Sequence, residues 1–331
     1  MMDPEKSAAI PLSIVTGYTK QWPGIWDTCD ALREAEDSFD KSRCYLPVNA
    51  AVALWNENLI ASDSIHIVPA LAAWRKSKEV YVFDKDLAVA LYEQVVDSKI
   101  PSNVLMSLPF YCVYIEAEPY RFFAYLDQDS QTKVWELRFS RLLGDGKASA
   151  YFLRIGNFTL KESIAEWVNN QPKVNFGQTF KMRQQLTDFD PYSDALNKKA
   201  IGEMLQLVLY ICAENADVQQ EESNVKTYHP SSGKPKDRYR EVREWVVGAR
   251  IGPSLRKQKS EVSGRTGTGS SSKKRPHIRR GHWHHYWTGR KPIQTLSLRW
   301  VAPFLVGNGD HAVRVHKVAV ENPNSQGGDT R

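Results

Sequence analysis

Features that would mark a membrane protein or a secreted protein are missing from this sequence of 331 residues. No hydrophobic run reaches about 18 residues, the length at which a membrane-spanning helix is expected. The N-terminus, Met-Met-Asp-Pro-Glu, has no basic stretch followed by an apolar one, so no secretory signal is predicted. We therefore expect a protein of the cytoplasm.

Cysteine is scarce, and none of the four cysteines forms a CxxC pair. Their spacing argues against a zinc site and a disulfide framework, and it favours reduced, buried thiols. Cys112 lies within an apolar run, which indicates a core thiol rather than a nucleophile. The other three are Cys29, Cys44 and Cys212.

Motifs for nucleophilic catalysis and for phosphate binding are also absent. The sequence contains no GxSxG, no GxxxxGKS/T and no GxGxxG, and the glycines of residues 264–269 belong to a low-complexity segment. We predict no catalytic residue, no cofactor and no metal site. The chain is therefore interpreted as a binding protein rather than a metabolic enzyme.

The composition that is present is typical of a globular protein with a sizeable core, with 42% hydrophobic and 25% charged residues. The net charge of +6 is unevenly distributed. Residues 254–291 hold eleven Lys or Arg and a single acid, Glu261, so this segment carries +10 and the rest of the chain −4. The basic character therefore belongs to one segment and not to the whole surface.

The first third of the chain is predicted to be mainly helical. Residues 1–20 show little pattern and are expected to form a flexible N-terminus. Asp84 suits a helix N-cap, because Leu87, Leu91 and Val95 recur every four residues after it. The expected elements are a helix over Asn49–Leu59, a helix ending near Trp74 and Arg75, a strand over Val80–Phe83 and a helix from Asp84 to about Val96.

The pattern changes from helical to strand-like between residues 101 and 156. Trp135, Leu137 and Phe139 alternate with polar residues, which predicts a strand with one buried face. The connections are short and contain Asp, Gly and Pro, and short connections favour an antiparallel meander. Its expected strands are Tyr111–Glu116, Tyr120–Leu126, Lys133–Arg141 and Ala148–Ile155.

A buried helix is expected over Asp194–Ala213, because Leu205–Cys212 is apolar on nearly every side. A shorter helix is expected from Thr159 to about Asn169. Residues 215–237 are polar and are interpreted as a loop, and residues 239–251 fit either a strand or a short helix.

Residues 254–276 are rich in Gly, Ser, Lys and Arg and are predicted to form a mobile basic loop. We expect three strands after it to join the main sheet, over Ile278–Trp287, Thr295–Pro303 and Ala312–Val320, followed by a flexible tail at 321–331. The predicted fold class is α+β. One compact domain over residues 21–320 packs helices against an antiparallel sheet, made of the meander and the C-terminal strands.

The densest group of chemically active side chains is the run RRGHWHHYW at residues 279–287. On a strand, His282, His284 and Tyr286 would share one face, and the residues between them would share the other. Three roles fit: a packed core strand, contact with a partner or nucleic acid, or metal binding and general base catalysis by histidine. No carboxylate motif nearby completes a metal site.

The basic segment suits contact with phosphates, with the neighbouring aromatic residues available to stack on bases. A solvated linker that only keeps the protein soluble fits the same composition. The sequence contains neither the RNP motifs of an RRM nor the GXXG loop of a KH domain. The candidate nucleic-acid-binding residues are Arg256, Lys257, Lys259, Lys273, Lys274 and Arg275.

Several segments together resemble the type V-A anti-CRISPR family that blocks biogenesis of its target effector nuclease. The most specific is His277–Gly289, which reads HIRRGHWHHYWTG and is rich in rare residues. The other segments are Ala73–Arg75, Leu108–Tyr114, Leu205–Ala213 and Arg299–Trp300. The resemblance covers about residues 50 to 307.

The resemblance implies an inhibitor, carried by a phage or plasmid, that acts in the cytoplasm of a bacterial host. Members of the family lower production of the effector by recognising its N-terminal polypeptide as it is made, with loss of its mRNA. Such a mechanism needs a groove for an extended peptide and suits proximity to the ribosome or mRNA. The expected peptide- or partner-binding residues are Arg279, Arg280, His282, Trp283, His284, Tyr286 and Trp287, with Trp74, Arg75, Tyr111 and Tyr114 as secondary candidates.

Two other functions fit the residues. One is a nucleic-acid-binding accessory protein of a mobile element, whose binding would depend strongly on salt. The other is a metal-dependent ribonuclease that uses His282 and His284, although the motif lacks carboxylate partners.

Overall fold

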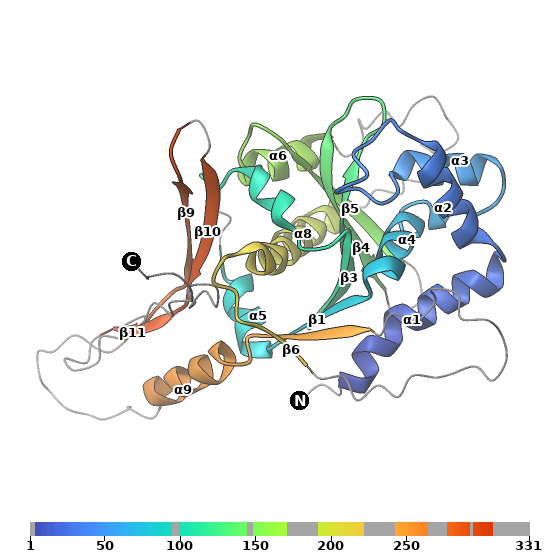
Figure 1. The fold of residues 1–331 in the computed structure, drawn as a ribbon. Helices are drawn as coiled ribbons and strands as arrows, with labels where there is room; N and C mark the ends of the chain where they lie inside the picture. The colour runs from blue at the N-terminus through green and yellow to red at the C-terminus, as the bar shows by residue number, and fades with distance from the viewer. Residues whose placement is uncertain are drawn as a thin grey trace, which may run out of the picture.

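The middle layer of the fold is a seven-stranded mixed sheet (Figure 1). The computed structural model describes residues 4–94, 99–143, 148–170, 191–221, 242–263, 277–291 and 294–306. Within these ranges the strand order is β5-β4-β3-β2-β1-β7-β6. The strands are β1 (Glu79–Phe83), β2 (Cys112–Ala117), β3 (Tyr120–Gln128), β4 (Trp135–Leu142), β5 (Ala148–Ile155), β6 (Val218–Gln220) and β7 (Arg243–Val247).

The meander predicted from the alternating pattern is confirmed. Strands β2 to β5 pair antiparallel with their neighbours in sequence order. Strand β1, in contrast, pairs parallel with both β2 and β7, so the sheet is mixed rather than purely antiparallel. The α+β class is confirmed.

Helices cover both faces of this sheet (Figure 1). On one side lie α1 (Pro4–Gln21), α2 (Ile25–Ala35), α3 (Val48–Asn56) and α4 (Val68–Ser77). On the other lie α5 (Lys85–Tyr92), the 3-10 helix η2 (Ser102–Ser107), α6 (Leu160–Asn170) and α8 (Pro191–Cys212). The helix α9 (Ile251–Ser263) packs beside α5. Each face therefore has its own hydrophobic core.

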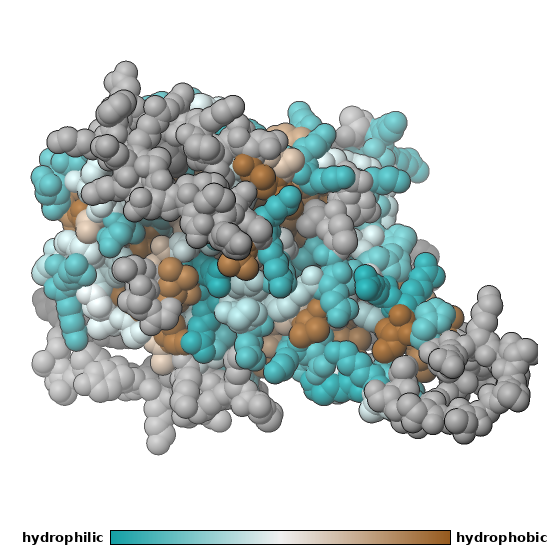
Figure 2. Space-filling view, turned by 180° about the vertical axis from the view of Figure 1, so that it is seen from behind, coloured by the Kyte–Doolittle hydropathy of each residue, from teal (hydrophilic) through white to brown (hydrophobic). Residues whose placement is uncertain are grey.

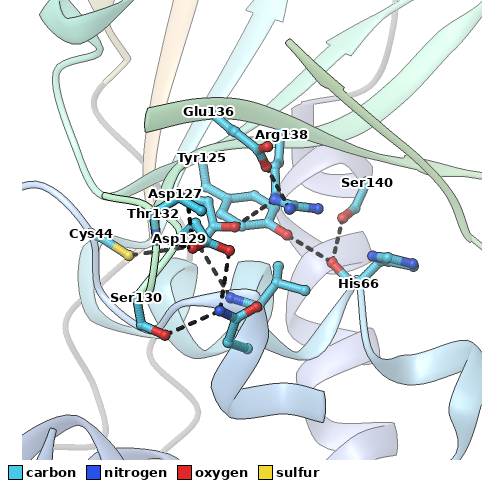
Figure 3. Close-up of polar contacts among 12 residues, drawn as sticks. Cys44, His66, Tyr125, Asp127, Asp129, Ser130, Thr132, Glu136, Arg138 and Ser140 are labelled. Atoms are coloured by element: carbon cyan, nitrogen blue, oxygen red, sulfur yellow. Dashed lines mark hydrogen bonds and ion pairs between the residues drawn. The ribbon is translucent and has the colours of Figure 1, made fainter. Parts of the chain in front are cut away.

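Because both faces are covered, the prediction that β4 has only one buried face is wrong. Its polar residues Glu136, Arg138 and Ser140 are at most 8% exposed. Figure 3 shows the hydrogen bonds and ion pairs around these residues. Arg138 Nε lies 2.6 Å from Asp127 Oδ2, and the other oxygen of this carboxylate accepts a hydrogen bond from the backbone N–H of Val48 at 3.1 Å. The network joins the sheet to the first residue of α3.

Two segments that were expected to be flexible are helical. Residues 4–21 form α1, because Ala8 and neighbouring apolar residues pack into the core on the α4 side. The first part of the predicted basic loop, up to Ser263, belongs to α9. Residues 264–276 and the predicted tail lie outside the described residues.

The other helical predictions are confirmed with small shifts at the ends. Asp84 caps α5, since its Oδ1 accepts hydrogen bonds from the N–H groups of Asp86 at 2.9 Å and Leu87 at 3.2 Å. Helix α8 is buried along its second half, as its apolar pattern predicts. The ambiguous residues 239–251 contain strand β7, and residues 218–220 of the predicted loop form strand β6. The described residues include no helix of the length and hydrophobicity needed to cross a bilayer.

The C-terminal strands do not join the main sheet, which corrects the prediction. Strand β9 (His282–Thr288) pairs with β10 (Thr295–Val301), and β8 (His277–Arg279) pairs with β11 (Phe304–Val306). Each pair is a separate two-stranded ribbon. Instead of pairing with the sheet, β9 and β10 bury Trp283, Leu298 and Trp300 in the core on the α8 side. The strand expected over Ala312–Val320 lies outside the described residues.

Candidate functional site

The β9–β10 ribbon contains five of the eleven predicted partner-binding residues, which are His282, Trp283, His284, Tyr286 and Trp287. It stands at one side of the molecule, next to α8 (Figure 1). Its register pairs Thr288 with Thr295 at one end and His282 with Val301 at the other. The predicted strand is interrupted before β9 at the buried Gly281, where a Cβ atom would lie only 2.9 Å from the carbonyl oxygen of Val301. The close approach of two backbones requires glycine there.

The inner face of the ribbon is part of the core. Trp283, Leu298 and Trp300 are at most 6% exposed. The indole Nε1 of Trp283 donates a hydrogen bond of 2.6 Å to Oε1 of Gln206, a buried residue of α8. Trp300 meets Tyr210 edge to face at 5.4 Å between ring centroids. Trp283 is therefore a core residue, as the interpretation of this segment as a packed core strand predicts. Its expected role as a partner contact was wrong.

The outer face carries His282, His284 and Tyr286, as the strand period predicts. Nε2 of His282 lies 3.1 Å from Nε2 of His284, a distance at which one ring donates and the other accepts. Arg299, opposite His284, holds its guanidinium 5.6 Å from the ring centre of Tyr286 and 3.1 Å from the Glu214 carboxylate. This face combines imidazole, phenol and guanidinium groups that do not serve the core.

Two further residues of β9, on the same face as Trp283, lie toward the end of the ribbon where that face reaches solvent. Trp287 is 54% exposed, which is unusual for so large an apolar side chain, and His285 is half-buried. Seen from behind, apolar side chains reach the surface in small patches separated by hydrophilic ones (Figure 2).

A pocket of about 260 Å³ adjoins the ribbon where β8 and β11 meet α5 and α9. Its lining is mixed, with apolar Val89, Leu255, Ile278 and Pro303 beside the exposed Arg280. The guanidinium of Arg279 lies 5.8 Å from the ring centre of Phe304, on the neighbouring strand. Both arginines of the predicted motif therefore lie at the surface.

The described part of the predicted nucleic-acid-binding set lies on α9. Arg256 contacts Asp84 at 2.8 Å and Asp86 at 2.9 Å, and Lys259 contacts Asp86 at 3.0 Å. These pairs fasten α9 to the start of α5 and partly neutralise the helix, which reduces its attraction for phosphates. Lys257 is exposed, while Lys273, Lys274 and Arg275 lie outside the described residues.

The secondary candidates lie away from the ribbon, in or beside the core on the opposite face of the sheet. Trp74 and Tyr114 are fully buried, and Nε1 of Trp74 donates to the backbone oxygen of Glu79 at 2.8 Å. A peptide at the surface cannot reach these two side chains, so they are corrected from partner contacts to core residues.

Arg75 and Tyr111 are also engaged internally. Nη2 of Arg75 lies 2.6 Å from Oδ1 of Asp30, and its guanidinium lies over the ring of Trp26. The hydroxyl of Tyr111 donates to the backbone oxygen of Lys41 at 3.0 Å. Local sequence gave no sign that these residues are separated from the histidine cluster by the sheet.

Residues that the prediction missed complete the ribbon site. Arg299 faces His284 across the hairpin, and Glu214 and Asn215, just after α8, bind the far side of β10. The alternation of β10 with β9 could have revealed Arg299, but nothing local marks Glu214 or Asn215. Among the described residues, no group of three or more His, Cys, Asp or Glu is placed to hold a metal ion.

Comparison with known proteins shows which family the chain is related to. Residues 81–308, more than half of the chain, match the Anti-CRISPR type V subtype A2 family. The chain belongs to this family. The resemblance seen in the sequence is thereby confirmed. The matched residues include the whole β9–β10 ribbon, whereas Trp74 and Arg75 precede the match.

Two individual proteins are similar to this chain. Protein FinQ of Escherichia coli is 24% identical over 286 residues, which cover 75% of this chain and 78% of FinQ. The crystal structure of AcrVA2 superimposes with a TM-score of 0.58 at 16% identity, covering 89% of this chain and 98% of that one. At this identity the structural match shows a shared fold.

Proposed function

We propose that this member of the anti-CRISPR family lowers the amount of a type V-A effector nuclease in the bacterial cytoplasm. In this proposal the chain recognises the N-terminal polypeptide of the effector as it emerges from the ribosome, and the effector mRNA is lost. The family membership supports the inhibition. The observation that supports peptide recognition is the outer surface of the β9–β10 ribbon.

The chemistry of that surface suits a polypeptide. His284 and Trp287 are exposed on the two faces of β9, and together with Arg299 they offer hydrogen-bond donors and acceptors, an aromatic face and a cation. A short peptide presents the matching groups, which are carbonyl oxygens, amide N–H groups and side chains of either kind. Aromatic and arginine side chains are also the residues that contribute most to protein interfaces.

Nucleic-acid binding is the second candidate, because Arg279, Arg280, Arg290 and Lys291 surround the ribbon and have no carboxylate partner among the described residues. Such cations suit the ribosome or mRNA as well as an acidic peptide. The ion pairs of Arg256 and Lys259 with α5 make α9 a poorer phosphate site than its composition suggests. We therefore place the peptide first.

One experiment separates the two candidates. Three versions of a type V-A effector gene are expressed with and without this protein. They carry the native start, synonymous codons over the first residues, or altered amino acids there. Recognition of the polypeptide predicts that effector and mRNA are lost for the native and synonymous versions and retained for the altered one.

Loss that follows the codons instead of the amino acids would assign recognition to the mRNA. Retention of the effector in all three cases would refute the proposed function. The proposal assigns no bond cleavage to the chain itself. Purified protein should therefore leave the effector mRNA intact with and without added divalent metals, and cleavage that a chelator stops would favour a ribonuclease using His282 and His284.

A further inference from the structure

The outer edge of β10 is covered by the segment that follows α8. The backbone N–H of Glu214 donates to the carbonyl oxygen of Leu298 at 2.9 Å. The side chain of Asn215 binds Trp300 twice, accepting from its N–H at 3.0 Å and donating to its carbonyl at 2.8 Å. The backbone groups of Leu298 and Trp300 therefore point away from β9.

This orientation determines which groups of β9 point outward. In an antiparallel pair, opposite residues alternate between those that bond each other and those whose backbone groups face away. Trp283 is opposite Trp300 and His285 is opposite Leu298, so the backbone groups of Trp283 and His285 face away from β10. The same alternation makes the backbone groups of Trp287 face away from β10. Within the described residues no third strand pairs with β9.

Among the residues that the structure describes, the open part of this edge runs from His285 to Trp287. Trp283 is only 6% exposed and lies at the buried end, whereas Trp287 is 54% exposed. Figure 1 shows the ribbon standing out from the body of the molecule. Strand β10 packs on α8 and η2, and β9 reaches α8 through Trp283 at its buried end. Exposed strand edges with unpaired N–H and C=O groups are templates for another strand.

We infer that β9 binds an extended peptide by strand addition, with backbone hydrogen bonds to His285 and Trp287. The inference rests on the proposed function, because it supplies the binding mode for a recognised polypeptide. Main-chain hydrogen bonds provide affinity in such complexes, and alternate side chains of the peptide provide specificity. One set would lie beside His284 and Tyr286, and the other beside His285 and Trp287.

The charges around β9 indicate the chemistry of the peptide. Arg279 and Arg280 precede the strand, and Arg290 and Lys291 follow it. No described carboxylate forms an ion pair with these four cations. Acidic residues near the two ends of the peptide would match them, and an aromatic or aliphatic residue would pack on Trp287. The expected ligand is an extended peptide with apolar and acidic residues.

Amide hydrogen exchange of the full chain, followed residue by residue by NMR, tests this mode. The probes are a synthetic peptide with the N-terminal sequence of a type V-A effector and a designed peptide in which Glu alternates with Val. In the free protein the amides of His285 and Trp287 should exchange fast. The amides of His284 and Tyr286, which bond β10, should exchange slowly and serve as the internal control.

With peptide at about a hundred times its dissociation constant, exchange at His285 and Trp287 should slow by roughly a hundredfold, because only the free fraction exchanges. Protection by the effector peptide supports both strand addition and the proposed function. Binding of that peptide without protection overturns strand addition alone. Protection by the designed peptide, with no binding of the effector peptide, supports strand addition and refutes the proposed target.

A pair of variants at one position provides a second measurement. His285→Pro removes an outward N–H, and proline is tolerated at strand edges, whereas His285→Ala keeps the N–H and removes only the ring. Strand addition predicts that the proline variant binds peptide roughly three- to tenfold more weakly than the alanine variant. If circular dichroism shows that both variants are folded, equal affinities for the peptide would contradict strand addition. Slow exchange at His285 that arises from dimerisation of this protein, without bound peptide, would also contradict it.

Discussion

Two neighbouring residues of β9 should respond to alanine in opposite ways. Trp283→Ala removes a side chain that is 6% exposed and leaves Oε1 of the buried Gln206 without its donor. Truncation of a buried aromatic residue costs about 3–5 kcal/mol of unfolding free energy. His284 is exposed, and among the described residues its side chain hydrogen-bonds only to His282, so His284→Ala should change stability by about 0.5 kcal/mol or less.

For activity we expect the opposite order, with the larger loss in the His284 variant. His284→Ala should retain the fold and lose most of the effect on effector level, because His284 lies at the centre of the proposed contact face. Trp283→Ala should lower the effect only in proportion to the loss of folded protein. Domains have a total unfolding free energy of roughly 5–15 kcal/mol, so the cost of Trp283→Ala is large enough to lower the abundance of the folded protein in cells.

Urea denaturation followed by circular dichroism measures the stability of each variant, and immunoblots measure effector and inhibitor together, so that effector loss is normalised to inhibitor abundance. Trp283→Phe is the matched control, since it keeps most of the ring but removes the hydrogen bond, and it should cost about 1–3 kcal/mol. Unfolding of His284→Ala, or full effector loss with that variant, would refute the division of β9 into a core face and a contact face.

Other perturbations test the fold and the charge distribution. Arg138→Met leaves its buried partner Asp127 without a counter-charge and should destabilise the chain by about 3–5 kcal/mol in urea denaturation. Burial, with the nearby carboxylates, raises the pKa of Glu244 to about 7, so the folded chain binds a proton more tightly than the unfolded one. Stability should therefore fall as pH rises from about 4.5 to 7, and Glu244→Gln should flatten this slope; an unchanged slope would contradict the assignment. Removal of Arg256 and Lys259 together should cost about 1 kcal/mol or less per ion pair and leave effector loss intact, whereas loss of activity with an intact fold would favour nucleic-acid binding on α9.

The elements that sequence analysis predicted well are those with strong local patterns. The alternation in β4 and the Asp84 cap of α5 depend on residues within a few positions of each other. Helix α1 was missed because its order depends on packing against α4 and β1, far along the chain. The cover on both faces of the sheet was missed for the same reason, and so the burial of Arg138 was not foreseen.

The candidate site shows the same division between local and long-range information. The two-residue period of a strand correctly separated Trp283 from His284. It could not show that Trp74 and Tyr114 are buried in a core on the opposite face of the sheet, because only the tertiary fold determines which side each strand presents. Nor could it show that Asn215 covers one edge of the ribbon and leaves the other open.

The position of the cations around β9 also affects how copies of this protein behave toward one another. An open strand edge invites pairing with an identical strand, which leads to dimers or aggregates. Both ends of β9 are basic, with Arg279 and Arg280 before it and Arg290 and Lys291 after it. Parallel or antiparallel, a second β9 would bring like charges together at both ends. Salt screens such repulsion over about 10 Å at 0.1 M, so self-association should increase as ionic strength rises, while an acidic strand is attracted most strongly in dilute salt.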